Sequence, residues 1–374
     1  MKIGIVLYPT FGGSGVVATE LGKALAQKNH EVHFITYSQP VRLGSFRENI
    51  FYHEVVVADY PLFDFQPYEI ALTSKLVDVV KYEKLDILHV HYAIPHASAA
   101  FMAKKILESQ KISIPFVTTL HGTDITLVGR DQSFEPVITF CINQSDAVTT
   151  VSESLKRDTY KYFKVDREIS VISNFIVESS VSFDQNLRRR YVEDDEKIVC
   201  HVSNFRKVKR IDDVIQIFAK IQASIPSKLI LIGDGPERYK AEQTSRALGI
   251  NKNVIFLGKL RNTDQVLSIS DLFLLPSETE SFGLAALEAM AVGVPVVSTN
   301  TGGIPEVNLD GFSGFTSSVG DVDSMAKNAL KILKKENLEI FKANARERAA
   351  LFSIERVLPK YEEIYSKLVK KVKE

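Results

Sequence analysis

The sequence lacks a surplus of either charge, a cysteine framework and a long apolar run. Lysine plus arginine and aspartate plus glutamate each total 46, so no basic excess favours nucleic acid and no acidic tail is present. The two cysteines, Cys141 and Cys200, lie in apolar runs without metal-ligand spacing, and we expect buried thiols in a reducing compartment. No stretch approaches the ~20 apolar residues that span a bilayer, and the apolar start is too short for a signal peptide. These absences predict a cytoplasmic protein without membrane insertion.

Strand-like and helix-like segments alternate twice along the 374 residues, which predicts an α/β protein with two doubly wound domains. We place the first domain at 1–176 and the second at 177–353, with the polar segment 178–190 as a link. The amphipathic C-terminal segment 354–374 predicts a helix that packs back on the first domain. The aromatic segment 43–68 is interpreted as a strand plus an excursion packed on that domain.

The segment 280–290, Glu-Ser-Phe-Gly-Leu-Ala-Ala-Leu-Glu-Ala-Met, follows an apolar run that we interpret as a buried parallel strand. Strong helix formers then predict a helix, so Glu280 falls on a loop at the carboxyl end of a strand, where open α/β sheets bind ligands. The free N–H groups of the helix start, at 281–283, could hold an anion or a sugar hydroxyl. Glu288 lies one to two turns deeper and could accept two hydroxyls of a diol. Alternatively, both glutamates are solvated surface residues.

Cationic side chains follow the first predicted strand of the second half, 197–203. The loop reads Asn204-Phe-Arg-Lys-Val-Lys-Arg210, and its arginines and lysines suit the oxygens of a diphosphate. The sequence Gly-Asp-Gly-Pro-Glu at 233–237 predicts a tight turn that a ligand or a neighbouring loop approaches closely. Arg261, after a further strand, could flank a base or a phosphate. The alternative for the cationic loop is a solvated basic turn.

A glycine turn at 12–15, Gly-Gly-Ser-Gly, separates a predicted strand at 2–8 from a predicted helix at 16–27. The pattern Gly-x-Gly-x-x-Ala from Gly13 fits the relaxed dinucleotide-binding fingerprint, which also requires an acidic residue after the second strand. That strand ends Phe-Ile-Thr-Tyr-Ser without a carboxylate, so an NAD-dependent oxidoreductase is disfavoured. The turn can still bring a ligand close to backbone N–H groups.

His121 directly follows a predicted strand and precedes a glycine, which places it where ligands bind. It could hydrogen-bond a sugar hydroxyl or a phosphate, or handle a proton. Capping the next helix is the weaker alternative, because Thr123 and Asp124 suit that role. His89 and His91 share one face of an earlier strand, and at least one of them is interpreted as structural.

Five features jointly match one known family. They are the Glu280 and Glu288 pair with seven residues between them, Phe282-Gly283, and the glycine motifs at 12–13, 233–237 and 302–306. With these motifs, the chain resembles the retaining glycosyltransferases of family 4 almost from end to end. The resemblance implies the GT-B architecture, in which two Rossmann-like doubly wound domains face a central crevice.

Within that family, the segments 89–96, 118–125 and 203–210 resemble the enzymes that transfer N-acetylglucosamine from UDP-GlcNAc to L-malate in bacillithiol biosynthesis. One departure from the general family supports this: Asn204 stands where Arg is usual, and an arginine lies two residues later. The resemblance implies retention of the α configuration. It also implies that no metal or other cofactor is needed, because arginine and lysine take the metal's place.

The resemblance also implies roles for individual residues. Arg206, Lys209 and the backbone at 281–284 would stabilise the departing diphosphate, Glu288 would bind the ribose diol, and Glu280 the hydroxyls of the sugar. The donor-binding residues that we expect are Gly15, Asn204, Arg206, Lys209, Arg261, Glu280, Ser281, Phe282, Gly283, Leu284 and Glu288. The expected catalytic residues are His121, Arg206, Lys209 and Glu280.

For the acceptor, we expect Ser14 with the neighbouring N–H groups, Tyr92, Thr119 and His121, because a dicarboxylate needs hydrogen-bond donors. One alternative is a related transferase that uses an inositol phosphate. Another is a non-catalytic nucleotide-sugar-binding protein, which would leave the cationic loop without a purpose. Because some enzymes of the family form pairs, the resemblance is compatible with a homodimer.

Overall fold

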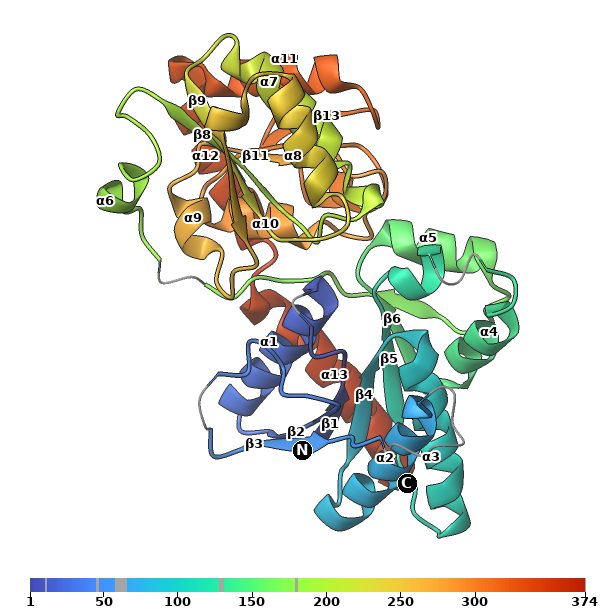
Figure 1. Cartoon of the computed structure of the whole chain (residues 1–374). Helices are drawn as coiled ribbons and strands as arrows, with labels where there is room; N and C mark the ends of the chain where they lie inside the picture. The colour runs from blue at the N-terminus through green and yellow to red at the C-terminus, as the bar shows by residue number, and fades with distance from the viewer. Residues whose placement is uncertain (11, 45–46, 58–65, 128–130, 179–180, 374) are drawn as a thin grey trace. The chain divides into compact units, whose positions relative to one another are not determined.

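The computed structural model describes residues 1–10, 12–44, 47–57, 66–127, 131–178 and 181–373. It divides the chain into two compact units (Figure 1). The N-terminal unit consists of Met1–Asn174 and Ile354–Glu374, and the C-terminal unit of Phe175–Ser353. The sequence had placed the boundary at 176, two residues later. The part of the predicted aromatic excursion at 58–65 lies outside the described residues.

The N-terminal unit is built on a parallel sheet whose described strands follow the order β3-β2-β1-β4-β5-β6-β7. The strands are β1 (Lys2–Val6), β2 (Glu31–Thr36), β3 (Ile50–Glu54), β4 (Ile87–His91), β5 (Phe116–Leu120), β6 (Ala147–Thr150) and β7 (Ile169–Val171). The helices are α1 (Gly13–Gln27), α2 (Tyr68–Glu83), α3 (Ser98–Ser109), α4 (Glu135–Gln144), α5 (Glu153–Tyr162) and α13 (Ile354–Lys373). Central strands such as β4 are buried throughout, as parallel strands covered on both faces must be.

The C-terminal unit repeats this plan with the strand order β10-β9-β8-β11-β12-β13. Its strands are β8 (Lys197–Val202), β9 (Ser227–Ile232), β10 (Val254–Gly258), β11 (Leu272–Leu275), β12 (Val296–Thr299) and β13 (Gly314–Ser317). Its helices are α6 (Gln185–Arg188), α7 (Ile211–Gln222), α8 (Arg238–Ala247), α9 (Asp264–Ser268), α10 (Leu284–Ala291), α11 (Val322–Leu333) and α12 (Lys335–Ala350). The sequence analysis did not anticipate β13.

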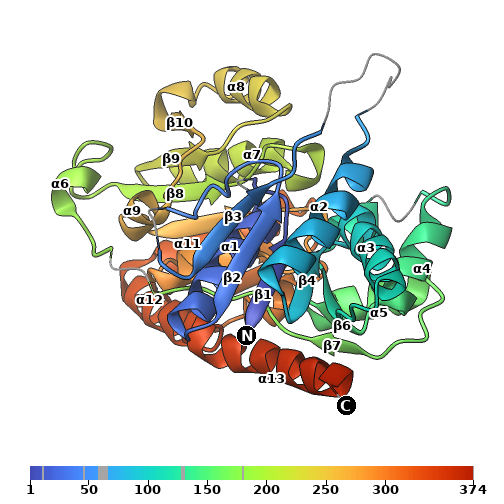
Figure 2. The same cartoon turned by 90° about the horizontal axis from the view of Figure 1, so that it is seen from below.

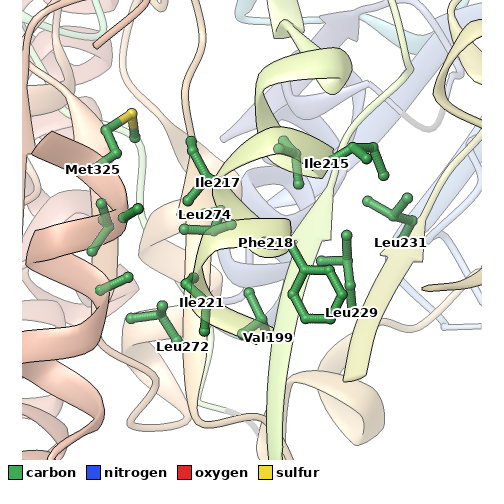
Figure 3. Close-up of a cluster of buried hydrophobic side chains, with 14 of the residues drawn as sticks. Val199, Ile215, Ile217, Phe218, Ile221, Leu229, Leu231, Leu272, Leu274 and Met325 are labelled. Atoms are coloured by element: carbon green, nitrogen blue, oxygen red, sulfur yellow. The ribbon is translucent and has the colours of Figure 1, made fainter. Parts of the chain in front are cut away.

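Successive strand residues in this unit point to opposite faces of the sheet and fill separate cores. Val199 and Leu229 belong to the larger core beneath α7 and α11, where Figure 3 shows Phe218 lying among them. Ile198 and Ile230, one residue away along the same strands, belong to the second core. Because the side-chain period of a strand is two, near-continuous apolar runs serve both faces at once.

The C-terminal helix α13 completes the N-terminal unit. Tyr361 and Tyr365 are buried on its inner face, at the helical spacing predicted from the sequence. The Tyr365 hydroxyl lies 2.6 Å from Nδ1 of His89 on β4, and α13 also contacts α1. Figure 2 shows this helix, in red, running beside the N-terminal sheet. None of the helices in the described ranges is both long and apolar enough to cross a membrane.

Each sheet contains one point at which the order of its strands reverses. In the N-terminal unit the chain builds outward from β1 to β3 and then returns to place β4 on the other side of β1. In the C-terminal unit the same reversal makes β11 the neighbour of β8. The loops that leave the carboxyl ends of two such strands diverge to opposite faces, and ligands of open α/β sheets bind between them.

The segment 178–190, predicted to be a polar link, is anchored at its C-terminal end. Arg188 on α6 is buried and donates to the carbonyls of Ile269 at 2.6 Å and Glu196 at 2.7 Å. It also forms an ion pair of 2.8 Å with Asp271, whose carboxylate accepts the Ile198 N–H. Although the segment is polar in composition, the guanidinium of Arg188 is buried and connects α6 to the residues that precede β8 and β11.

We expect Arg188→Ala to lower the free energy of unfolding of the C-terminal unit by roughly 3–5 kcal/mol, because it leaves the Asp271 carboxylate buried beside an incomplete set of partners. The matched control is Arg189→Ala, which removes an exposed pair with Asp194 and should have little effect. Urea denaturation followed by circular dichroism measures both variants. Equal losses for the two would contradict the anchoring role.

Candidate functional site

In the C-terminal unit, the loops after β8 and β11 meet at the point where the strand order reverses. The Glu278 N–H donates to the Val208 carbonyl at 2.8 Å and ties one loop to the other. Beside this tie, the Lys209 ammonium forms an ion pair with Oε1 of Glu280, and the Ser277 hydroxyl donates to the same oxygen at 2.9 Å. The two charged side chains remain 20% and 14% exposed. The structure therefore brings together two predicted catalytic residues that are 71 positions apart.

His201 on β8 holds the start of the cationic loop through hydrogen bonds. Its Nδ1 lies 2.8 Å from the Leu274 carbonyl, which can only accept, so Nδ1 carries the proton. Nε2 then accepts from the Ser203 hydroxyl at 2.8 Å, and the Phe205 N–H donates to that hydroxyl oxygen at 3.3 Å. Burial lowers the pKa of His201 to about 4, so the ring is neutral at neutral pH. This neutral histidine links β8 to β11 and orients the loop that carries Lys209.

The glycine motifs of this unit allow neighbouring strand-end loops to touch. A Cβ on Gly233, which has a φ of +123°, would lie 1.7 Å from the Ser203 carbonyl oxygen. A Cβ on Gly302 would lie 1.9 Å from the carbonyl oxygen of Glu280. Close packing of loop against loop thus explains both motifs, which is the second of the two readings offered for the turn at 233–237. The glycines hold in place the backbone on both sides of the ion pair.

The remaining predicted donor residues are divided between the loops and α10. Asn204 and Arg206 are exposed on the cationic loop, whereas the Phe282 side chain is buried against Phe352, so only its backbone can serve a ligand. Gly283 ends the loop at a φ of +93°, and α10 begins at Leu284 with Glu288 half-buried on its second turn. Ser281 is half-exposed on the same loop. Arg261 is exposed after the edge strand β10, two strands from β8, and the structure does not join it to the ion pair.

In the N-terminal unit, the loops after β1 and β4 place two predicted acceptor residues together. The Ser14 hydroxyl, in the first turn of α1, lies 2.5 Å from the Tyr92 hydroxyl. The first N–H groups of a helix have no acceptor within the helix, so the turn of α1 beside Ser14 offers donors to an anion. Burial raises the pKa of Tyr92 to about 12, which keeps its hydroxyl a donor across the physiological range.

His121 belongs to a group of buried histidines behind Tyr92. Its Nε2 lies 2.8 Å from Nδ1 of His91, and its ring centroid is 5.2 Å from that of Tyr92. Burial lowers the pKa of His121 to about 3, so the imidazole is neutral and a weak base at neutral pH. The hydrogen-bonding role predicted for His121 agrees with this setting, and its role in proton transfer stays a prediction. The predicted shared face of His89 and His91 is confirmed, because their rings stack at 4.4 Å.

The geometry bears on two further predictions in this unit, those for Thr119 and Gly15. Thr119 is fully buried in β5, and its hydroxyl is engaged by Nε2 of His89 at 2.7 Å and by the Thr149 hydroxyl at 2.6 Å. Its hydroxyl therefore belongs to the hydrogen bonding of the core, and this setting gives no support to the predicted role of Thr119 as an acceptor ligand. Gly15, predicted to bind the donor, faces its own loop: a Cβ there would lie 2.5 Å from the Tyr8 carbonyl oxygen. Close packing of the chain on itself explains why this position is a glycine, and its predicted part in donor binding stays a prediction.

The sequence analysis missed several residues that complete the two sites. Tyr8 packs its ring against those of Tyr92 and His96, and Ser277 and His201 support the ion pair of the C-terminal unit. Tyr8 and Ser277 each follow the end of a parallel strand by two residues. A polar side chain at the carboxyl end of a strand is the one sequence signal that could have identified them.

Two family models match the chain over its two halves. The model described as Glycosyltransferase Family 4 matches residues 11–179, and the model described as Glycosyl transferases group 1 matches residues 183–348. An N-acetyl-alpha-D-glucosaminyl L-malate synthase from Bacillus anthracis is 49% identical over 374 residues, which cover 98% of this chain and 96% of that protein. The chain belongs to glycosyltransferase family 4. The family predicted from the joint motifs is therefore confirmed, and the protein is a glycosyltransferase.

Two further comparisons concern the fold and a second relative of this family 4 chain. The structure of sucrose-phosphate synthase from Thermosynechococcus elongatus superposes with a TM-score of 0.83 at 19% identity, covering 99% of this chain and 100% of that one. This likeness confirms the predicted GT-B class with two doubly wound domains. A D-inositol 3-phosphate glycosyltransferase from Mycolicibacterium smegmatis is 34% identical over 168 residues, which are 42% of this chain and 37% of that protein.

We expect Gly233→Ala to destabilise the C-terminal unit by roughly 3 kcal/mol, because the new Cβ combines a left-handed φ with overlap of the Ser203 carbonyl. Gly249→Ala is the matched control: its φ is +70°, but no atom lies within 4 Å of the added Cβ. It should show the conformational penalty alone, about 1 kcal/mol. Chemical denaturation compares the two variants, and an equal loss would show that loop contact is not what requires Gly233.

Proposed function

We propose that the protein transfers N-acetylglucosamine from UDP-N-acetylglucosamine to the hydroxyl of L-malate with retention of the α configuration. This is the first step of bacillithiol biosynthesis. The observation that carries the proposal is the 49% identity, over almost the whole chain, with a relative named for this reaction. The geometry of each unit agrees with one half of the reaction: charged groups suited to a nucleotide diphosphate in one, and hydroxyl donors suited to a small anion in the other.

The donor half of the proposal rests on Lys209 and Glu280. Each neutralises the other in the structure, and a UDP-sugar offers a better partner to both: diphosphate oxygens to the ammonium and sugar hydroxyls to the carboxylate. The exposed Arg206 adds a second cation from the same loop. As the bond to the sugar breaks, negative charge grows on the diphosphate, and cations held on a fixed loop stabilise that charge. Glu288 would receive the ribose diol.

The acceptor half rests on Ser14 and Tyr92. Their hydroxyls and the N–H groups at the start of α1 are hydrogen-bond donors grouped at one strand end, and a carboxylate of malate accepts several such bonds. The neutral His121 behind Tyr92 could bind a hydroxyl as donor or acceptor without adding charge. We propose that the leaving phosphate takes the acceptor proton.

An inositol phosphate is the second candidate acceptor, because the mycolicibacterial relative carries that substrate in its name. The comparison that favours it covers 42% of this chain, whereas the one that favours malate covers 98%. A single assay separates the two.

The proposal predicts UDP release from UDP-N-acetylglucosamine with L-malate, and at most a few per cent of that rate with inositol phosphate or with UDP-glucose as donor. A coupled UDP assay measures the rates, and proton NMR of the product reads the anomeric configuration. Because loop cations supply the charge neutralisation, the rate should not change when EDTA is added. Binding of UDP-N-acetylglucosamine without turnover for any acceptor would overturn the proposal in favour of a sugar-binding protein.

The two glutamates should differ in what they contribute. Glu280→Ala is expected to lower kcat by more than it weakens UDP binding, because its carboxylate faces the sugar and Lys209. Glu288→Ala is expected to weaken UDP binding by about ten- to a hundredfold, since one charged hydrogen-bonding group is lost. Glu278→Ala is the control, because its exposed side chain lies on the same loop and its contact with Val208 uses the backbone. Calorimetric UDP titration and initial rates would show whether the pattern is reversed, which would undo the assignment.

A further inference from the structure

The backbone of Tyr92 is strained. This residue has a φ of +87° and a ψ of 140°. Residues other than glycine rarely adopt this backbone conformation, which costs on the order of 1–3 kcal/mol. Three hydrogen bonds of the flanking peptides hold it, one of them from the Ala97 N–H to the Tyr92 carbonyl at 3.3 Å. The Tyr92 N–H donates to the Thr119 carbonyl at 2.9 Å, and the next N–H, that of Ala93, donates to Oδ2 of Asp124 at 3.0 Å. The bond from Tyr92 to Thr119 continues the sheet, whereas the bond from Ala93 is accepted by a side chain on another loop.

Asp124 bridges the loops that follow β4 and β5. While Oδ2 accepts from Ala93, Oδ1 accepts the Gly122 N–H at 3.0 Å, and the side chain is 2% exposed. A buried carboxylate is tolerated when backbone donors surround it. Burial nevertheless raises the pKa of Asp124 to about 6, against the opposing effect of these N–H groups. The position requires two acceptor oxygens, because an amide would point its NH2 group at one of the two N–H donors.

We propose that Asp124 is a positioning residue of the acceptor site, which holds Tyr92 in the strained conformation that brings its hydroxyl to Ser14. This inference rests on the proposed function, because it takes Ser14 and Tyr92 as acceptor ligands. Asp124 acts on the acceptor through the peptide that it binds. Without the bond to Ala93, Tyr92 is free to relax toward a negative φ, and the phenol then leaves the 2.5 Å contact with Ser14.

The effects of substituting Asp124 and Tyr92 should be energetically coupled. Tyr92→Phe removes the hydroxyl, and Asp124→Asn removes the restraint that places it. If the second acts through the first, the effect of Asp124→Asn on the KM for malate must be largely absent when residue 92 is already Phe. A carboxylate that serves only the stability of the fold has no reason to show this non-additivity.

The test is a double-mutant cycle of Asp124→Asn and Tyr92→Phe in the full chain, with L-malate varied at saturating UDP-N-acetylglucosamine. We expect each single variant to raise the KM for malate about tenfold, and the double variant to raise it no further than the larger single effect, while the affinity for UDP is unchanged. Effects that multiply would overturn the inference and leave the acceptor site standing. An unchanged KM in Tyr92→Phe would overturn both the acceptor site and the inference.

Two further variants separate positioning from folding. Asp146→Asn alters another carboxylate of this unit that accepts a backbone N–H, from Phe116 at 2.8 Å, but lies at the opposite ends of the strands. It should lower the melting temperature without changing the KM for malate, and a raised KM would overturn the inference by showing that any loss of stability has this effect. If Asp124→Asn does not fold, Asp124→Glu enters the same cycle, since it keeps the charge and displaces the oxygens by one methylene.

Discussion

The reversal of strand order in each parallel sheet is the constraint on which the rest of the structure depends. A strand that returns to the other side of the first strand leaves two loops diverging at their carboxyl ends, and every candidate ligand contact is made by such loops or by their neighbours. For the loops to support one another, their backbones must come closer than a Cβ permits. The glycines at 233 and 302 meet that requirement in the C-terminal unit, whereas Gly15 in the N-terminal unit allows its own loop to fold closely on itself. Glycines that resemble ligand-binding motifs are thus part of the framework that positions the ligand-binding side chains.

The same topology carries opposite chemistry in the two units. At the reversal point of the C-terminal unit a lysine and a glutamate face each other and remain partly exposed, so a charged ligand can replace either partner. At the reversal point of the N-terminal unit the polar groups are hydroxyls and imidazoles, and burial keeps the imidazoles neutral. One site therefore suits charge that changes during a reaction, while the other suits the recognition of shape and hydrogen-bonding pattern. Such a division agrees with the proposed reaction, in which the donor's leaving group gains charge and the acceptor is a small hydroxylated anion.

Most helices and the strands other than β13 could be predicted, as could the place of Lys209 and Glu280 on strand-end loops, because apolar runs, glycine turns and strand-end polar residues report directly on a parallel sheet. The ion pair between these two side chains was not predicted. The failures have a common cause. Thr119, Arg188 and Asp124 are polar residues whose partners are backbone groups or core side chains far away in the sequence, and local pattern does not show whether a polar group is satisfied internally. Thr119 looked like a ligand and is a core residue, whereas Arg188 looked like part of a link and is buried. The strain at Tyr92 likewise has no local sequence signature, since any residue can occupy the end of a strand.

The N-terminal unit is built from two separate segments of the chain, and this order has a consequence for synthesis. In the sequence, the C-terminal unit, Phe175–Ser353, lies after the strands of the N-terminal sheet and before the helix that covers that sheet. When the strands that surround β4 leave the ribosome, Tyr361 and Tyr365 do not yet exist, and the face of the sheet around His89 stays uncovered until the last helix is made. The second unit can finish folding first, although it is encoded later. The N-terminal unit is therefore synthesised as two separate segments, and its core is complete only after the twenty residues of α13 have been made.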